Sequence, residues 1–232
     1  MAGDPMTEHA RRTSVGRSIA RSTARPVATH DGLKRSMDVL VAGVAALVLL
    51  PVLMIIWAAI RLTSPGGAVF RQTRLGADRC PFVMYKFRTM KSDTDDALHR
   101  EYVARLLTEE VEAVDGLYKL VDDPRITTVG AFLRKTSLDE LPQLFNVLSG
   151  ELSLVGPRPA LAYEATLFPS WADARFSVKP GVTGLWQVSG RNRLRMTDGL
   201  RLDIEYVARR TIWLDVRILL RTVPALFSGG AR

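Results

Sequence analysis

The chain has 232 residues and a mass of 25.7 kDa, which suffices for one domain with an appendage but is thin for two domains with separate cores. Lys and Arg number 32 against 24 Asp and Glu, so the net charge of +8 favours an anionic partner such as a nucleotide, a nucleic acid or an anionic lipid. The single cysteine, Cys80, excludes an intrachain disulfide and therefore a disulfide-stapled secreted scaffold.

The first 33 residues are rich in Ser, Thr, Ala and Arg and show almost no apolar periodicity. We expect residues 1–33 to form a disordered basic tail. Solubility or attraction to anionic lipid headgroups accounts for such a tail, and we assign it no chemistry.

A long apolar segment follows, from Val39 to Ile60, with 22 residues that include no charge and no hydroxyl group. As a helix it would be about 33 Å long, against about 30 Å for the hydrocarbon core of a bilayer. A cleavable signal peptide is a poor alternative, because the segment starts far from Met1, is too long and lacks a small-residue cleavage site before Arg61.

Two features of this segment favour a re-entrant helix over a spanning one. Basic residues flank both ends, so the rule that keeps Lys and Arg cytoplasmic draws both ends to the same side. Pro51 breaks a helix and leaves halves of 12 and 9 residues, too short for either to cross a bilayer alone. We therefore expect residues 34–62 to form a helix–break–helix that enters and leaves the cytoplasmic leaflet, with a kinked spanning helix as the alternative.

The remaining residues, 63–232, read as one cytosolic domain. A turn is predicted at Ser64-Pro65-Gly66-Gly67, and the Val, Phe and Tyr content predicts strands over 68–74 and 82–87. Apolar spacing predicts helices over residues 95–107, 136–148 and 200–221. The last of these carries Trp and Arg, which suits a membrane surface as well as packing on the domain's own core. The predicted fold class is α/β and mainly helical, with a re-entrant helix–break–helix and amphipathic interfacial helices.

The candidate catalytic residues are carboxylates among basic side chains, since Walker A, G-x-G-x-x-G, H-E-x-x-H and G-x-S-x-G patterns are absent. Asp139 and Glu140 follow Arg134 and Lys135 at the predicted start of a helix. Ser137-Leu-Asp-Glu140 matches a capping box, which is a purely structural explanation of the pair. A helix N-terminus also keeps Asp139 ionised, as a nucleophile or a hard-metal ligand must be.

A second cluster combines glycine with arginine, over residues 154–159 and 179–192. Glycines let backbone N–H groups approach phosphate oxygens, and a guanidinium matches those oxygens bidentately. Such loops fit a diphosphate. Without further context, ordinary turns with solvated arginines are the simpler explanation.

The chain also carries a set of long, ordered motifs. They are Lys34-Arg35-x-x-Asp38, the Pro-broken apolar segment, YKFRTM at 85–90, DDPRIT at 122–127, LRKTSLDELPQLFNVLSGELSLVGPRP at 133–159 and KPGVTGLWQVSGRN at 179–192. Together they resemble the bacterial sugar transferase family, the polyprenyl-phosphate hexose-1-phosphate transferases or monotopic phosphoglycosyl transferases. The resemblance covers about residues 33–224, nearly all of the chain outside the tail.

The resemblance implies an enzyme on the cytoplasmic face of the inner membrane that begins exopolysaccharide, O-antigen or other glycoconjugate assembly. It implies transfer of a sugar-1-phosphate from a UDP-sugar to a polyprenyl phosphate such as undecaprenyl phosphate, with release of UMP. In that family the Asp of the D-E pair is a nucleophile that forms a covalent phosphosugar intermediate with the help of Mg²⁺. Here that residue is Asp139, which is also the expected Mg²⁺ ligand, with Glu140 beside it. Larger members add an N-terminal bundle of membrane helices, and this chain resembles the minimal form.

The charges in such a reaction indicate which residues bind phosphate. The donor diphosphate, the acceptor phosphate and the carboxylate repel one another, so a metal and several cations must offset the repulsion. The candidate phosphate-binding residues are Lys86, Arg88, Arg134, Arg158, Arg191 and Asn192. The expected partners are the UDP-sugar, the polyprenyl phosphate and membrane lipids, without nucleic acid, and the sequence is compatible with a homo-oligomer.

Two other functions remain open at this level. A membrane-tethered basic nucleic-acid-binding or regulatory protein explains the charge and the apolar segment, but not the acidic pair with its Gly/Arg loops, and no helix-turn-helix or zinc-finger spacing is present. A glycosyltransferase that transfers the sugar without its phosphate would release UDP in place of UMP. No residue of the sequence indicates which sugar is transferred.

Overall fold

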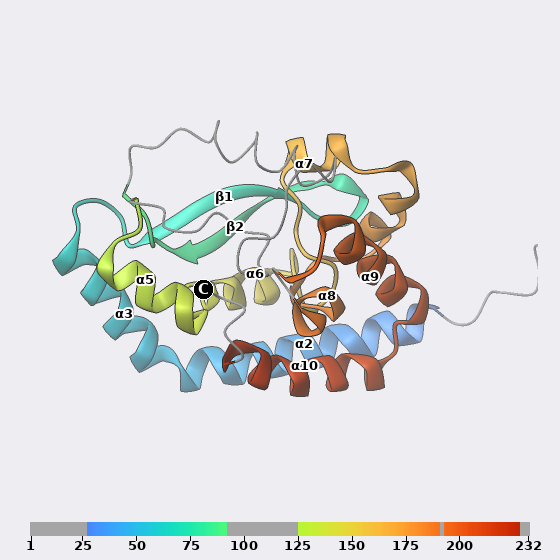
Figure 1. The fold of residues 1–232 in the computed structure, drawn as a ribbon. Helices are drawn as coiled ribbons and strands as arrows, with labels where there is room; N and C mark the ends of the chain where they lie inside the picture. Colours follow the sequence, from blue (N-terminus) through green and yellow to red (C-terminus); the bar gives the residue numbers. More distant parts are fainter. Residues whose placement is uncertain (1–26, 92–124, 191–192, 228–232) are drawn as a thin grey trace, which may run out of the picture. The chain divides into compact units, whose positions relative to one another are not determined.

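The computed structural model describes residues 27–91, 125–190 and 193–227. By its contacts the chain divides into Met1–Lys34 and a compact unit, Arg35–Arg232, which is mainly helical with two small sheets (Figure 1). The helices are α2 (Val27–Val48), α3 (Leu50–Thr63), α5 (Thr128–Thr136), α6 (Gln143–Ser149), α7 (Ala162–Leu167), α8 (Leu185–Ser189), α9 (Met196–Arg209) and α10 (Ile212–Phe227). Short 3-10 helices are η1 (Ala77–Arg79), η2 (Leu138–Glu140) and η3 (Ser170–Ser177), and the strands are β1 (Val69–Leu75), β2 (Pro81–Phe87), β3 (Ser153–Val155) and β4 (Gly181–Thr183).

The predicted break in the apolar segment is present. α2 ends at Val48, α3 begins at Leu50, and the two helices are bent by 61°. Pro51 lies in the first turn of α3, where its missing N–H needs no helical partner. Within the described ranges no single helix is long and apolar enough to cross a membrane, although the bent pair meets that test together. α2 begins at Val27, earlier than the predicted boundary of the tail, and residues 1–26 lie outside the described part of the chain.

Polar contacts fix α2 to β3. The carboxylate of Asp38, which is 3% exposed, accepts from Ser153 Oγ at 2.7 Å and from the backbone N–H of Leu154 at 3.2 Å. One turn earlier, Arg35 donates to the carbonyl oxygens of Val147 at 2.5 Å and Leu148 at 2.8 Å, at the end of α6. The carbonyls at a helix C-terminus lack helical partners, so a guanidinium satisfies them well. Arg35 and Asp38 of the Lys34-Arg35-x-x-Asp38 motif therefore hold α2 to α6 and β3.

The strands predicted over 68–74 and 82–87 form an antiparallel hairpin, β1–β2, with Phe70 opposite Lys86. The outer edge of β2 is closed by the side-chain amide of Asn146, which lies on α6 and is fully buried. Its Oδ1 accepts from the N–H of Tyr85 at 3.0 Å, and its Nδ2 donates to the carbonyl of Val83 at 2.7 Å. The amide thus replaces a neighbouring strand and fixes the hairpin against α6.

β3 and β4 form a parallel pair whose backbones approach closely because of glycine. A Cβ on Gly181 would lie 2.1 Å from the backbone nitrogen of Gly156, and one on Gly184 would lie 2.2 Å from the carbonyl oxygen of Gly156. Neither position tolerates a side chain. Strand packing, rather than approach of a phosphate, accounts for these three glycines.

The helix predicted over 200–221 is two helices, so this prediction is wrong. α9 ends at Arg209 and α10 begins at Ile212, where the hydroxyl of Thr211 accepts from the N–H of Leu214 at 3.1 Å. Thr is a favourable N-cap, and the amphipathic pattern continues across the cap, which conceals the break in the sequence. The helix predicted over 95–107 lies outside the described residues.

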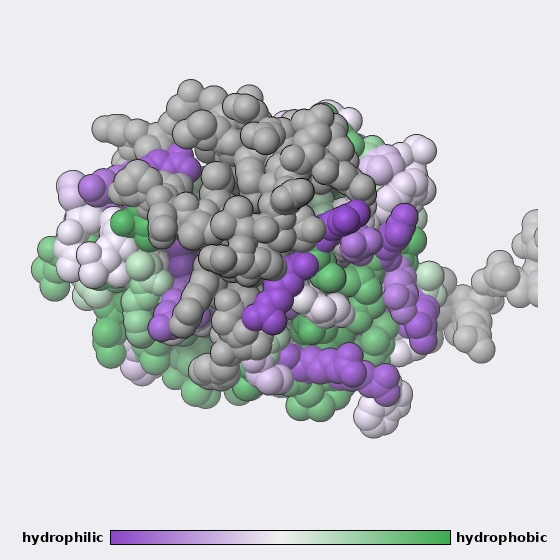
Figure 2. All heavy atoms as spheres, in the orientation of Figure 1, coloured by the Kyte–Doolittle hydropathy of each residue, from purple (hydrophilic) through white to green (hydrophobic). Residues whose placement is uncertain are grey.

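Three apolar cores stabilise the described part of the unit. The first joins the hairpin, α6, β3, α9 and α10, with Ala42 of α2 in it, the second joins α3 to α5, and a smaller third core joins α7 to η3. Many large apolar side chains remain exposed on α2, α3 and α10, among them Leu40, Leu47, Ile55, Trp213 and Leu220. In Figure 2 hydrophobic residues form a green band along the lower edge, where Figure 1 places α2, α3 and α10. A contiguous exposed apolar surface of this kind is typical of a membrane or protein interface.

Candidate active site

The Asp139–Glu140 pair lies in the short 3-10 helix η2, between α5 and α6, and not at the start of an α-helix. Ser137 ends α5 in a left-handed conformation (φ 55°, ψ 19°), and its side chain makes no capping hydrogen bond to η2. The capping-box explanation is therefore wrong, and the helix predicted over 136–148 is confirmed only from Gln143 on, as α6. The residues on either side of the acids explain the turn, since Leu138 and Leu141 pack against the second core, beside α3. These two leucines are partly buried, and their packing anchors the turn that carries the acids.

Glu140 contacts the hairpin. Its Oε1 accepts from Nζ of Lys86 at 3.2 Å, across 54 positions of sequence, and both side chains are partly buried. The pairing register of β1 with β2 and the Asn146 contacts fix β2 beside η2, and this fixes the lysine. The sequence-based set of Lys86, Asp139 and Glu140 is thus brought together by the fold.

Asp139 is partly buried, and its pKa is raised from 3.8 to about 6. Burial is the main cause, because it disfavours the charged carboxylate. The positive charges of Lys86 and Arg134 oppose this effect, and the negative charge of Glu140 adds to it. No helix N-terminus keeps Asp139 ionised, contrary to the expectation from the sequence. Instead, the charges of two nearby cations partly offset the rise in pKa that burial causes.

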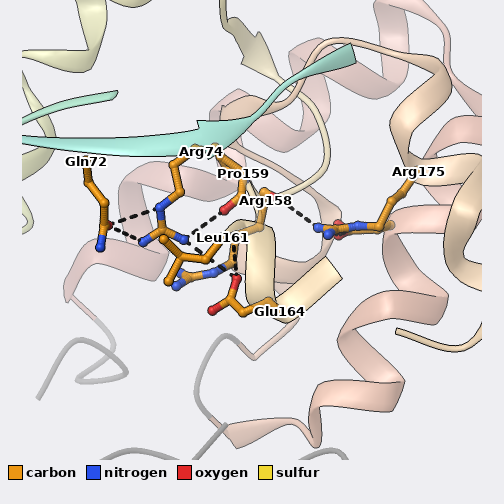
Figure 3. A network of polar contacts seen from close by, with 8 residues as sticks. Gln72, Arg74, Arg158, Pro159, Leu161, Glu164 and Arg175 are labelled. Carbon is orange, nitrogen blue, oxygen red and sulfur yellow. Dashed lines mark hydrogen bonds and ion pairs between the residues drawn. The ribbon is translucent and has the colours of Figure 1, made fainter. Parts of the chain in front are cut away.

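Arg158 follows β3 and is held through its backbone by two buried arginines that approach from opposite sides (Figure 3). Arg74 of β1 donates to the carbonyl of Pro159 at 3.1 Å, and Arg175 of η3 donates to the carbonyl of Arg158 at 2.6 Å. The guanidinium of Arg158 is exposed and makes no hydrogen bond or ion pair within the described residues. The fold therefore fixes the backbone at Arg158 and leaves its charge available to a ligand.

Arg175 and Arg74 are each bound by an acidic or polar side chain. Arg175 binds Asp203 of α9 at 2.7 Å, and their side chains are 2% and 1% exposed. Arg74 binds Glu164 at 3.7 Å and the side-chain oxygen of Gln72 at 2.6 Å. Burial and the neighbouring charge of Arg158 lower the pKa of Arg74 to about 10, against the opposing charges of Glu164 and Glu140. Arg74 still carries its charge at neutral pH.

The other predicted phosphate-binding residues do not all lie beside the acidic pair. Arg88 is buried, and its guanidinium donates to the carbonyl of Pro65 and, at 2.7 Å and 3.0 Å, to the hydroxyl and carbonyl of Ser64. Arg88 therefore closes the turn between α3 and β1. These contacts occupy the guanidinium N–H groups that would otherwise bind a phosphate. Arg134 is partly buried on α5 and acts on Asp139, whereas residues 191–192 (Arg and Asn) lie outside the described part of the chain.

The residues that support the site were not predictable from the sequence motifs. Asn146, Arg74, Arg175 and Asp203 each have a partner at least 28 positions away, and the local pattern around Asn146, Arg175 and Asp203 gives no sign of burial. A weak signal was available for Arg74, because an arginine inside a predicted strand of a two-stranded hairpin needs an acceptor when it faces the core.

The carboxylates fit a Mg²⁺ ion that arrives with a diphosphate better than one held by the protein alone. Within the described residues no group of three or more His, Cys, Asp or Glu side chains could hold a metal. Mg²⁺ is commonly bound by one or two carboxylates together with substrate phosphates and water. Asp139 and Glu140 satisfy that smaller requirement, although Glu140 is shared with Lys86.

Sequence comparison identifies relatives of this chain among known proteins. The profile of the family described as bacterial sugar transferase matches residues 29–229. The chain is 40% identical over 193 residues to the exopolysaccharide production protein ExoY of Rhizobium meliloti, an alignment that covers 83% of this chain and 84% of ExoY.

Two other relatives are named for the reactions that they catalyse. The undecaprenyl-phosphate galactose phosphotransferase of Salmonella typhimurium is 41% identical over 195 residues, which cover 84% of this chain but 40% of that protein. The UDP-glucose:undecaprenyl-phosphate glucose-1-phosphate transferase of Caulobacter vibrioides is 39% identical over 212 residues, covering 88% of this chain and 73% of that protein. The chain thus spans most of ExoY and less than half of the Salmonella protein.

Proposed function

Since the chain belongs to the bacterial sugar transferase family, we propose that it transfers a sugar-1-phosphate from a UDP-sugar to a polyprenyl phosphate such as undecaprenyl phosphate, releasing UMP. The names of two relatives support these substrates, and the name of ExoY supports a role in exopolysaccharide production. The observation that carries the proposal is Asp139, a partly buried carboxylate with a pKa raised to about 6 and two cations acting on it.

The proposed reaction has two displacements at one phosphorus. First, a carboxylate oxygen of Asp139 attacks the phosphorus that bears the sugar, the bond from that phosphorus to the bridging oxygen breaks, and UMP leaves with the electron pair. Then an oxygen of the polyprenyl phosphate attacks the same phosphorus, and the acyl phosphate bond breaks to restore the carboxylate. Division into two steps lets UMP leave before the second anionic substrate reacts.

The charges of the site suit the first step. With a pKa of about 6, Asp139 is about nine-tenths ionised at pH 7, so it is a usable nucleophile that is only weakly solvated by water. Lys86, Arg134 and the exposed guanidinium of Arg158 are the cations that we assign to the phosphates, and Arg191 and Asn192 stay in the predicted set. We assign Arg88 to the turn that it closes rather than to a phosphate.

A magnesium ion, when bound, would neutralise the diphosphate and stabilise the negative charge that develops on UMP. Asp139 would hold it together with phosphate oxygens of the donor, and Glu140 would keep Lys86 directed at the same place. The cationic side chains bind and orient the phosphates, and Asp139 carries the transferred group.

The membrane position follows from the apolar surface. We propose that α2 and α3 form a re-entrant pair in the cytoplasmic leaflet, because they are bent by 61° and carry basic residues at both flanks. The exposed thiol of Cys80 and an engineered cysteine at Ser18 should then react with a membrane-impermeant reagent from the same side. Reaction from opposite sides would establish a spanning helix.

The decisive experiment for the reaction is mass spectrometry of the purified enzyme after incubation with UDP-sugars and Mg²⁺ but without lipid acceptor. A sugar-phosphate adduct is expected on a peptide that contains Asp139, together with one UMP per adduct. Asp139→Asn should form no adduct, whereas the exposed carboxylate of Asp173 provides the matched control, Asp173→Asn.

The outcomes separate the alternatives. Undiminished transfer by Asp139→Asn would remove this residue from the mechanism, and release of UDP would indicate transfer of the sugar without its phosphate. A panel of UDP-sugars in the same assay identifies the donor. The family match leaves the nucleic-acid-binding alternative without support.

A further inference from the structure

A pocket of about 330 Å³ lies where α8, α9 and α10 meet. Its lining includes three arginines and one acid together with apolar side chains, chiefly Arg209, Arg217, Arg221, Glu205, Leu185 and Trp213. It shares no lining residue with the candidate active site. The proposed transfer reaction therefore gives this pocket no role.

The pocket has an excess of positive charge, because three arginines face one glutamate. Arg209 binds Glu205 at 2.6 Å, one helical turn away on α9, so this pair is neutral. Arg217 and Arg221 are exposed and make no hydrogen bond or ion pair with any residue that the structure describes. Two adjacent guanidinium groups on one helix turn are the groups that bind a phosphate best.

The position of these two arginines on α10 relates the pocket to the apolar surface. At about 100° per residue, Trp213 and Leu220 lie within about 20° of each other around the helix, while Arg217 and Arg221 lie about 40° and 80° to one side of Trp213. Trp213 and Leu220 are 82% and 71% exposed. The arginines thus border an exposed apolar stripe, and Figure 2 shows hydrophilic residues over α10 directly beside the green lower edge.

We propose that this pocket binds the phosphate of an anionic phospholipid headgroup, with Arg217 and Arg221 as its ligands and the Trp213–Leu220 stripe against the acyl chains. Tryptophan at an interface and arginine at the phosphate level are the arrangement expected of a helix lying in a membrane surface. A soluble anion would satisfy the arginines but leave the stripe in water, and this favours a lipid as the occupant. The proposal needs the protein to be membrane-bound but does not depend on the transfer chemistry.

Native mass spectrometry of the full chain in detergent, titrated with phosphatidylglycerol, tests the pocket without an activity readout. The Arg217→Gln/Arg221→Gln variant should bind this lipid about tenfold more weakly than the parent, since two charge-assisted contacts are lost. The matched control, Arg71→Gln/Arg201→Gln, removes two exposed arginines from outside the pocket and should bind as the parent does. Phosphatidylcholine, whose choline cation offsets its phosphate charge, should bind more weakly than phosphatidylglycerol to the parent and should lose less affinity in the Arg217→Gln/Arg221→Gln variant.

Several results would overturn the proposal. An equal loss in the two double variants would show a general charge effect, and competition by inorganic phosphate as strong as that by the lipid would show a free-anion site. Displacement by polyprenyl phosphate, with the same dependence on Arg217 and Arg221, would make the pocket part of the acceptor site. If the double variant does not fold, the single Arg221→Gln variant serves, with a loss that should remain larger than that of Arg201→Gln.

Discussion

Asp139 should cost the protein stability at neutral pH, so replacing it should raise the melting temperature while abolishing transfer. Burial raises the pKa of its carboxyl from 3.8 to about 6, and the folded state therefore prefers the protonated form. The cost is absent below about pH 4 and is fully present above about pH 6. The difference between 3.8 and about 6 corresponds to about 3 kcal/mol of unfolding free energy at pH 7.5, and to about half of that at pH 5.

Asp139→Asn has no charge at either pH and should remove this cost. For a chain of this size, about 3 kcal/mol corresponds to a rise of roughly 6–12 °C in the melting temperature. Thermal unfolding of the detergent-solubilised protein at pH 7.5 and pH 5, at one scan rate, measures the change. The control, Asp173→Asn, removes a carboxylate whose side chain is 58% exposed and should alter stability by less than about 0.5 kcal/mol. If Asp139→Asn melts at or below the parent at pH 7.5, the carboxyl is not under the strain that we infer.

Three further substitutions test the surroundings of the site. Lys86→Met should move the acidic limb of the pH–rate profile to higher pH, because the lysine charge lowers the pKa of Asp139; initial rates between about pH 5 and 8 measure it, and an unmoved limb would show that the lysine does not act on this carboxyl. Asp203→Asn leaves the buried guanidinium of Arg175 uncompensated and should reduce the unfolding free energy by about 3–5 kcal/mol, so a melting temperature equal to that of the parent would contradict a stabilising role of the Arg175–Asp203 ion pair. Arg158→Lys keeps the charge but loses the fork, and turnover should fall about tenfold with no change in melting temperature; parent-like turnover would mean that this residue does not bind phosphate.

Features that depend on local pattern were predictable from the sequence. The hairpin strands follow from their Val, Phe and Tyr content, and the break between α2 and α3 follows from Pro51, which must lie in the first turn of a helix or end one. The pairing of Lys86 with Asp139 and Glu140 was reached only through family motifs, since 54 positions separate the lysine from Glu140.

Features that depend on long-range packing were not predictable. The S-x-x-E pattern at Ser137 has the form of a capping box, but burial of Leu138 and Leu141 against α3 decides the turn in favour of a 3-10 helix. The cap at Thr211 divides an apolar pattern that reads as continuous. At Ser137 a tertiary contact outweighs the local motif, and at Thr211 a single side-chain cap interrupts the apolar periodicity.

The attachment of α2 to β3 by Asp38 fixes the distance between the proposed membrane helix and the arginine proposed to bind phosphate. The backbone N–H bound by Asp38 belongs to Leu154, four positions before Arg158, and even a fully extended chain of that length spans only about 14 Å. No flexible tether lies between the proposed membrane helix and the arginine that would bind phosphate. A bilayer that is thinner or thicker than the native one should therefore raise or lower that arginine with the helix, and transfer should depend on acyl-chain length as well as on headgroup charge.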